Sequence, residues 1–188
     1  MLSEVIEFNN RYGLLDGCDS VIVGLSGGAD SVALFHVLRE LRSRYGFSII
    51  AVHVHHGIRG EEADRDLDFC RNLCRRYGVE LREFFYDIPK LAKELSLSRE
   101  EAGRKVRYDS FRSVASEYEN SRIAVAHHGN DRAETVIFNM TRGTGMKGLR
   151  GIVPMRDNII RPLLFVTKAD ILGYLDEVHQ DYCLDSTN

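Results

Sequence analysis

One short segment of this chain, residues 26–31, has the side chains and backbone best suited to binding phosphate. It lies between the apolar runs 21–25 and 32–38. Glycines let the backbone approach an oxyanion closely, and the N–H groups at the start of a helix point toward it. The segment has no lysine, so it is not the G-x-x-x-x-G-K-[ST] loop of the common nucleoside triphosphatases. We expect a phosphate-binding cradle of another class, made of Ser26, Gly27, Gly28, Ala29, Asp30 and Ser31.

Five of the seven histidines lie in two clusters, each at the end of an apolar run with the length of a strand. The first cluster ends the run 48–54, and the second follows the run 122–126. Ligands of open parallel sheets bind beyond the carboxyl ends of the strands, so both clusters are candidates for a site. A buried structural role stays open for each histidine, and no H-x-x-x-H helix completes a zinc site. The five are His53, His55, His56, His127 and His128.

A basic and aromatic stripe is expected on one face of a helix over 99–118. Arg104, Arg107, Tyr108 and Phe111 follow i, i+3, i+4, i+7 spacing and therefore share one helix face. Such arginines either reach a phosphate at the strand ends or pack their stems on apolar surface as half-buried residues.

Charged residues after the second histidine cluster have two interpretations each. Asp131 and Glu134 fit a helix cap pair, or carboxylates that act in a site. The stretch 142–168 contains six basic residues and only one acidic residue. A solvated face explains such a stretch, but its four glycines also suit close approach to RNA phosphates. The candidate RNA contacts are Arg142, Lys147 and Arg150.

Alternating strand and helix patterns predict an α/β fold, with a parallel sheet between two layers of helices. We expect a single domain over residues 1–188. The predicted strands cover 20–25, 48–54, 79–85 and 122–126, and the predicted helices cover 2–11, 30–44, 62–77, 99–118, 131–141 and 168–179.

The composition is that of an ordinary globular protein, with 44% hydrophobic and 28% charged residues and a formal net charge of −3. The charge excludes a globally basic protein, so any RNA contact must use a local patch. The four cysteines lack the C-x-x-C spacing of zinc or redox sites, which favours plain thiols. The N-terminus is polar and no apolar run is long enough to span a membrane, so we expect a cytoplasmic protein.

Several ordered motifs resemble a known family. The segment 26–31 is similar to the S-G-G-x-D-S motif of the PP-loop ATP pyrophosphatases, which cleave ATP between its α- and β-phosphates. Later motifs resemble those of the tRNA(Ile)-lysidine synthetases within this superfamily. They are the helix motif E-A-A-R-x-x-R-Y at 101–108, H-H-x-D-D-Q-A-E-T at 127–135, R-G-x-G-x-x-G-L-x-G at 142–151, R-P-L-L at 161–164 and D-S-T-N at 185–188.

The resemblance implies a PP-loop fold and an ATP-dependent ligase. It would join L-lysine to C2 of the wobble cytidine of tRNA(Ile) with a CAU anticodon, through an adenylated cytidine, releasing AMP and pyrophosphate. It implies ATP and Mg²⁺ as cofactors, a catalytic role for Asp131 and Arg104, and Mg²⁺ contacts from Asp30 and Asp131. A homodimer stays open. The ATP-binding residues implied are Ser26, Gly27, Gly28, Ala29, Asp30, Ser31, His53, His55, Arg104 and His127.

The chain departs from the family pattern at three positions, where Asn130 replaces an aspartate, Arg132 replaces a glutamine and Gly103 replaces an alanine. Asp131, which keeps the second aspartate of this motif, is therefore the expected catalytic carboxylate. The family's C-terminal tRNA-binding region is expected to be missing from this chain, which corresponds to the N-terminal catalytic domain. Two alternatives stay open. One is another PP-loop enzyme, acting in tRNA thiolation or in amidation of a small acid, although the C-x-x-C pairs of many thiolation enzymes are absent. The other is a non-enzymatic adenine-nucleotide sensor.

Overall fold

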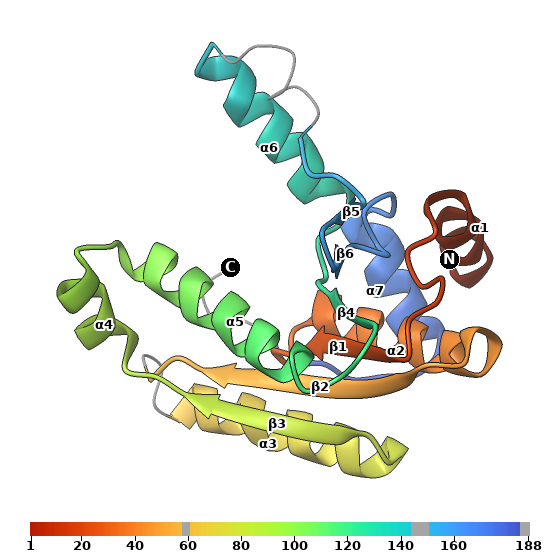
Figure 1. Cartoon of the computed structure of the whole chain (residues 1–188), viewed down its shortest axis with the longest axis horizontal. Coiled ribbons are helices and arrows are strands. Elements are labelled where there is room, and N and C mark those ends of the chain that lie inside the picture. The colour runs from red at the N-terminus through yellow and green to blue at the C-terminus, as the bar shows by residue number, and fades with distance from the viewer. Residues whose placement is uncertain (58–60, 144–150, 185–188) are drawn as a thin grey trace.

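A six-stranded sheet runs through the molecule in the order β3-β2-β1-β4-β6-β5, and only β5 is antiparallel to its neighbour. The structure is a computed structural model that describes residues 1–57, 61–143 and 151–184. Figure 1 shows helices on both sides of the sheet, which confirms the predicted α/β class. The strands are β1 (Ser20–Gly24), β2 (Ser48–His55), β3 (Glu80–Phe85), β4 (Ser121–Ala124), β5 (Met155–Arg156) and β6 (Ile159–Ile160).

Strand β1 is apolar along most of its length because both of its faces are covered. Val21 and Val23 join a core with α2 and α7, whereas Ile22 points to the opposite face and joins a core with α5. Helix α3 lies on the α2 side, and α4 packs against α5. The helices are α1 (Leu2–Tyr12), α2 (Ala29–Tyr45), α3 (Glu61–Tyr77), α4 (Ile88–Leu95), α5 (Arg99–Ala115), α6 (Gly129–Thr141) and α7 (Lys168–Glu177).

Every predicted strand and helix is present, with ends that differ by three residues or fewer. Helices α5 and α7 begin with capping boxes, at Ser98 and at Thr167. Three elements were not predicted. Strands β5 and β6 have only two residues each, and α4 is too short to show a helical period. Its start is nevertheless marked by Asp87, whose side chain accepts a hydrogen bond from the Lys90 N–H at 3.0 Å.

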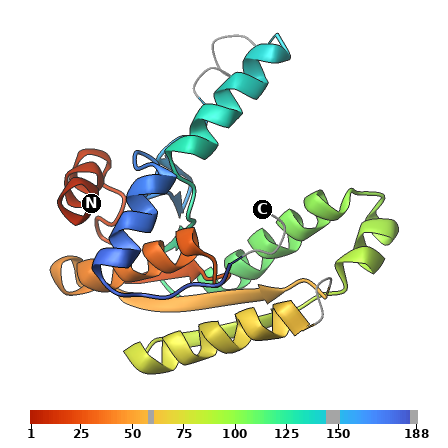
Figure 2. The same cartoon turned by 180° about the vertical axis from the view of Figure 1, so that it is seen from behind.

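Helix α6 extends away from the rest of the molecule in both views (Figures 1 and 2). None of its residues is buried, and it exposes the large apolar side chains Ile137, Phe138 and Met140. In the described ranges, no helix combines the length and apolar character that crossing a membrane requires.

Candidate active site

The segment 26–31 connects β1 to α2 and includes the first three residues of α2. The Ser26 N–H donates to Ser31 Oγ at 3.1 Å, and the hydroxyl oxygens of the two serines lie 3.0 Å apart. The Ser31 hydroxyl also donates to the Gly28 carbonyl at 2.9 Å, and Gly28 is the N-cap residue of α2. The loop therefore sits on a helix N-terminus, where the partial positive charge favours an anion.

Gly27 is required in this loop for two reasons. Its φ is +95°, a backbone conformation that residues with a Cβ rarely adopt. An added Cβ would also lie 3.2 Å from Cys183 Sγ. The Cys183 N–H donates to the Gly27 carbonyl at 2.9 Å, so the chain beyond α7 runs beside the cradle. The cradle is thus supported by segments from both ends of the sequence.

Replacing Gly27 by alanine should weaken ATP binding about tenfold or more, because the loop must shift away from Cys183 or relax its φ. A positive φ costs a non-glycine residue of the order of 1–3 kcal/mol. Gly46→Ala is the matched control, since Gly46 has a φ of +76° and open space around its Cα. Calorimetric titration with ATP should show the loss only for Gly27→Ala, whereas both variants should melt at a lower temperature. Equal ATP affinity in the two variants would contradict the role given to the loop.

The three predicted strand ends lie next to one another, because β1 is flanked by β2 and β4. The chain passes from β1 to β2 and β3 on one side and returns with β4 on the other. The boundary between β1 and β4 is therefore a topological switch point, where α/β proteins bind ligands. The cradle follows β1 there, and the second histidine cluster follows β4.

A row of three polar side chains crosses this switch point. His128 Nε2 lies 3.8 Å from Asp30 Oδ2, and His128 Nδ1 lies 3.7 Å from Asp131 Oδ2. His128 is buried, and both carboxylates are partly exposed. The row places two negative charges on either side of one imidazole ring, directly beside the cradle.

The predicted cap pair of Asp131 with Glu134 is wrong, because Asp131 is not the N-cap residue of the helix. Helix α6 begins at Gly129 with His128 as the N-cap residue, and the His128 N–H donates to Asp131 Oδ2 at 2.8 Å. Asp131 is thus the third residue of the helix, and its side chain accepts the backbone N–H of the N-cap residue. Glu134 is exposed. Asp131 therefore holds the helix start and also presents its carboxylate at the switch point.

Asn130, one of the departures from the family pattern, has a structural partner. Its side-chain oxygen accepts a hydrogen bond from the Lys168 N–H at 3.1 Å, at the first residue of α7. The Gly129 N–H also donates to the Val166 carbonyl at 2.8 Å. An amide oxygen meets this need as well as a carboxylate, so the N-termini of α6 and α7 stay joined.

The histidines at the strand ends are held in defined orientations. His53 is buried, and its Nδ1 donates to the Leu25 carbonyl at 2.9 Å, which supports the residue before the cradle. His55 Nε2 lies 3.3 Å from Asp64 Oδ1. His127 Nδ1 accepts a hydrogen bond from Arg161 Nε at 3.3 Å, and burial next to this guanidinium lowers the pKa of His127 to about 4. His127 is therefore neutral at pH 7.

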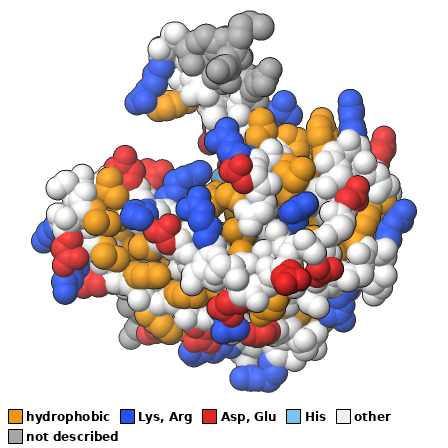
Figure 3. Space-filling view, in the orientation of Figure 1, with side chains coloured by type: hydrophobic (Ala, Val, Ile, Leu, Met, Phe, Trp, Pro, Cys, Tyr) orange, Lys and Arg blue, Asp and Glu red, His pale blue; other side chains and the backbone are white. Residues whose placement is uncertain are grey.

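The basic and aromatic stripe of α5 divides between core and surface. Phe111 is buried beneath the sheet, whereas Arg104 and Arg107 are exposed. The Arg104 guanidinium carbon lies 5.0 Å from the centre of the Tyr108 ring. Figure 3 shows Lys and Arg side chains gathered over α5 at the edge of the hollow below α6. The arginines of the stripe are therefore surface residues, and Phe111 anchors the stripe in the core.

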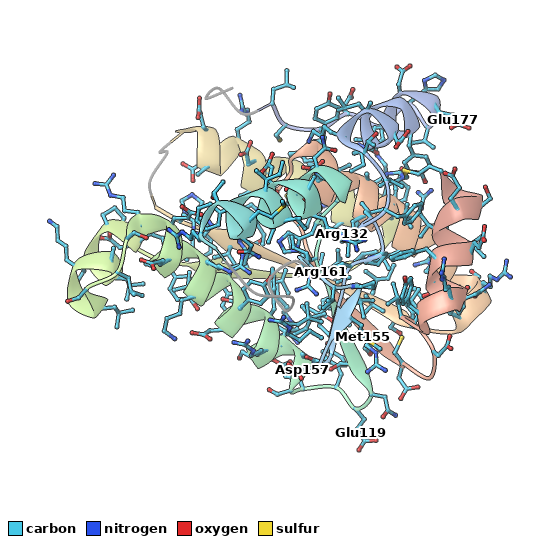
Figure 4. All side chains as sticks on the ribbon, turned by 90° about the horizontal axis from the view of Figure 1, so that it is seen from above. Glu119, Arg132, Met155, Asp157, Arg161 and Glu177 are labelled. Atoms are coloured by element: carbon cyan, nitrogen blue, oxygen red, sulfur yellow. The ribbon has the colours of Figure 1, made fainter. Side chains whose placement is uncertain are left out.

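Arg161 adds a buried cation to this side of the site, and the sequence placed it in the motif at 161–164 without assigning it to the site. It donates to the Val153 carbonyl at 2.9 Å as well as to His127. Figure 4 shows Arg161 and Arg132 in the middle of the molecule viewed from above. His128 was a candidate in the second histidine cluster without an assigned role, and Lys168 was not a predicted site residue, because only the folded chain brings it to Asp30.

Two of the three predicted RNA contacts, Lys147 and Arg150, lie outside the described residues, as does the motif at 185–188. Arg142 is described and exposed, and its guanidinium carbon lies 4.2 Å from the centre of the Phe138 ring. Where the chain returns to α6, Gly151 has a φ of +59°, and an added Cβ would lie 2.7 Å from a Val136 methyl group. This glycine of the motif at 142–151 thus allows close packing on α6.

Asp30 and Asp131 are the carboxylates available at the switch point as oxygen ligands for a metal ion, and they are a pair rather than a complete set. Within the three described ranges, no group of three His, Cys, Asp or Glu side chains is arranged to hold a metal ion. Mg²⁺ bound to a nucleotide needs fewer protein ligands, because one or two carboxylates join the phosphate oxygens and water. The two aspartates therefore fit a magnesium–nucleotide complex.

Comparison with known proteins identifies the family of the chain. Residues 4–188 match the family described as the PP-loop domain, whose members bind ATP. The chain is 39% identical over 189 residues to a tRNA(Ile)-lysidine synthase of Clostridium tetani, and 42% identical over 184 residues to that of Bacteroides thetaiotaomicron. These matches cover 100% and 98% of this chain but only 40% and 42% of the two relatives.

A solved structure shares the fold. The U34-tRNA thiolase NcsA from Methanococcus maripaludis, with its [4Fe-4S] cluster, superimposes with a TM-score of 0.74 at 21% sequence identity. The match covers 97% of this chain and 64% of that chain. At this identity the likeness supports the PP-loop architecture alone.

Proposed function

Since the chain belongs to the family of ATP-binding PP-loop domains and is 39% identical to a tRNA(Ile)-lysidine synthase, we propose that it takes part in making lysidine. In the proposed reaction, ATP adenylates the wobble cytidine of tRNA(Ile) with a CAU anticodon, and pyrophosphate leaves. The amine of free lysine then attacks C2 of the cytidine, and AMP leaves. The chain spans about 40% of the length of such relatives, so the activity of the whole protein is part of the proposal.

The observation that carries the proposal is the row of Asp30, His128 and Asp131 beside the cradle, with spacings of 3.8 and 3.7 Å. A cradle alone binds phosphate. A pair of carboxylates next to it provides what a second, amine substrate needs, because a carboxylate can orient an ammonium or amine group. Catalysis would then come mainly from positioning and from electrostatic stabilisation.

Each part of the site has a proposed task. Ser26, Gly27, Gly28 and Ser31 hold the phosphates of ATP, and Arg104 stabilises the charge that develops on the α-phosphate and on the leaving pyrophosphate. Asp131 is the main catalytic carboxylate and orients the lysine amine. Asp30 and Asp131 would hold Mg²⁺, which when bound neutralises phosphate charge.

Two of the histidines at the strand ends, His53 and His127, fit roles in nucleotide binding that need no charge. His53 supports the carbonyl next to the cradle, and His127 is held by Arg161 through its Nδ1. Since Nδ1 of His127 is the acceptor, its Nε2 carries the proton and is a donor for a nucleotide oxygen. His55 lies further out, where it contacts the Phe85 ring at 5.4 Å between centroids.

Helix α6 is the proposed tRNA contact. Its exposed face combines apolar side chains with Arg142, which stacks on Phe138. Proteins bind unstacked RNA bases on aromatic rings and guanidinium planes, and they bind the RNA backbone through basic side chains. The Gly-rich stretch with Lys147 and Arg150 follows this helix in the sequence.

Replacing Arg142 by alanine should weaken tRNA binding about tenfold without affecting ATP binding. The slope of log affinity against log salt concentration should also fall by roughly one unit, because one phosphate contact is lost. Arg44→Ala is the matched control, since Arg44 is also exposed and lies over the ring of its neighbour Tyr45, at the far end of α2. An Arg142→Ala variant with wild-type tRNA affinity would remove α6 from the proposed interface.

The experiment that tests the proposed function measures lysine, AMP and pyrophosphate together. Transfer of labelled lysine to tRNA(Ile) that depends on ATP supports it. Pyrophosphate release that needs neither lysine nor tRNA would indicate another PP-loop enzyme instead. Binding of ATP or AMP without turnover would indicate a nucleotide sensor.

A further inference from the structure

A lysine from the far end of the chain contacts the aspartate of the cradle. Lys168 Nζ lies 2.6 Å from Asp30 Oδ1, although the two residues are 138 positions apart in sequence. Lys168 is the first residue of α7, and Asp30 lies in the first turn of α2. The cradle contains no lysine of its own, so this ammonium group is a positive charge brought to it by the fold.

The position of Lys168 is fixed by the backbone around it. Thr167 caps α7 and exchanges hydrogen bonds with Asp170, and the Lys168 N–H donates to the Asn130 side chain. Helix α7 is packed against α2 through a buried face that includes Ile171 and Leu175. The backbone of Lys168 is therefore held in place, and its side chain extends to Asp30 of the cradle.

Stability alone is a poor explanation for this ion pair. The side chains of Lys168 and Asp30 are 42% and 31% exposed, and ion pairs this accessible contribute little to the free energy of folding. A nucleotide bound in the cradle, in contrast, brings several negative charges close to the Asp30 carboxylate. A cation is needed there to offset their repulsion.

We propose that Lys168 binds the β- and γ-phosphates of ATP, which leave as pyrophosphate, and that Asp30 holds its ammonium group in place until the nucleotide arrives. The ammonium group can then turn from the carboxylate to the phosphates, because the phosphates carry more negative charge than one carboxylate. This inference rests on the ATP-binding part of the proposed function and is independent of lysine transfer to tRNA.

The test compares nucleotide binding by two variants of Lys168, measured by calorimetry in the presence of Mg²⁺ without tRNA or lysine. Lys168→Met should raise the dissociation constants of ATP and of pyrophosphate about tenfold or more, and leave that of AMP within about twofold. Lys168→Arg keeps the charge and should recover most of the affinity. Lys105→Met is the matched control, because Lys105 forms a similar exposed pair with Asp109 at 2.7 Å.

Three results would overturn this assignment. They are a lower melting temperature of Lys168→Met with unchanged ATP affinity, an equal loss for AMP and ATP, and an equal effect of Lys105→Met. The first would show a purely structural ion pair. Because binding is measured without tRNA, a failure of lysine transfer with intact ATP binding would count against the proposed function and not against Lys168.

Discussion

Replacing Asp131 by asparagine should lower lysine transfer at least about a hundredfold while the fold survives, a loss of the size seen when a charge-stabilising group is removed from an active site. The carboxylate accepts the His128 N–H at 2.8 Å and also faces the His128 ring. An asparagine oxygen can keep the first of these contacts, so α6 should still begin at Gly129. It cannot supply the negative charge that positions an amine or a magnesium ion.

The structure also explains why alanine is the poorer choice at this position. Asp131→Ala removes the acceptor at the start of α6 as well as the charge, and losing a cap costs about 1 kcal/mol. The asparagine variant separates these effects. Glu134→Gln is the matched control, because it also removes one negative charge, about one turn later in α6, from an exposed residue. Wild-type lysine transfer by Asp131→Asn would remove the catalytic assignment.

Replacing Arg104 by alanine should lower ATP-dependent pyrophosphate release by about a hundredfold, because the first chemical step develops negative charge on the phosphates. Arg104 is exposed, and its guanidinium carbon lies 5.0 Å from the centre of the Tyr108 ring. It is therefore free to turn toward a nucleotide at the switch point.

The control for this prediction comes from the same ring. Arg112 also lies over Tyr108, at 5.8 Å, but it pairs with Asp109 in the last turn of α5. Arg112→Ala should leave pyrophosphate release unchanged, and both variants should unfold at similar temperatures. If the two variants released pyrophosphate at equal rates, Arg104 would have no special part in activating ATP.

The order of strands and helices could be predicted because each element carries its own local signal. The doubly buried run 20–25 and the capping residues Ser98 and Thr167 mark their elements without any information from the rest of the chain. The cradle was recognisable for the same reason, since its glycines and hydroxyls are contiguous.

The remaining features of the site depend on contacts between distant segments, which no local pattern encodes. Lys168 meets Asp30, and Cys183 runs beside Gly27, only because α7 packs on α2. The start of α6 was predicted wrongly because Asp131 fits an N-cap residue in sequence. The helix begins two residues earlier, and Asp131 lies within its first turn, where its side chain accepts the N–H of the N-cap residue. Such contacts are found from the fold alone.

The most direct test of the proposed activity follows labelled lysine and nucleotide products in one reaction. The protein is incubated with ATP, Mg²⁺, labelled lysine and tRNA(Ile) with a CAU anticodon, and in parallel with the same tRNA carrying uridine at the wobble position. We expect label in the CAU tRNA only, with one AMP and one pyrophosphate released for each lysine joined. Formation of ADP and phosphate, or of AMP without dependence on lysine and the wobble cytidine, would contradict the account.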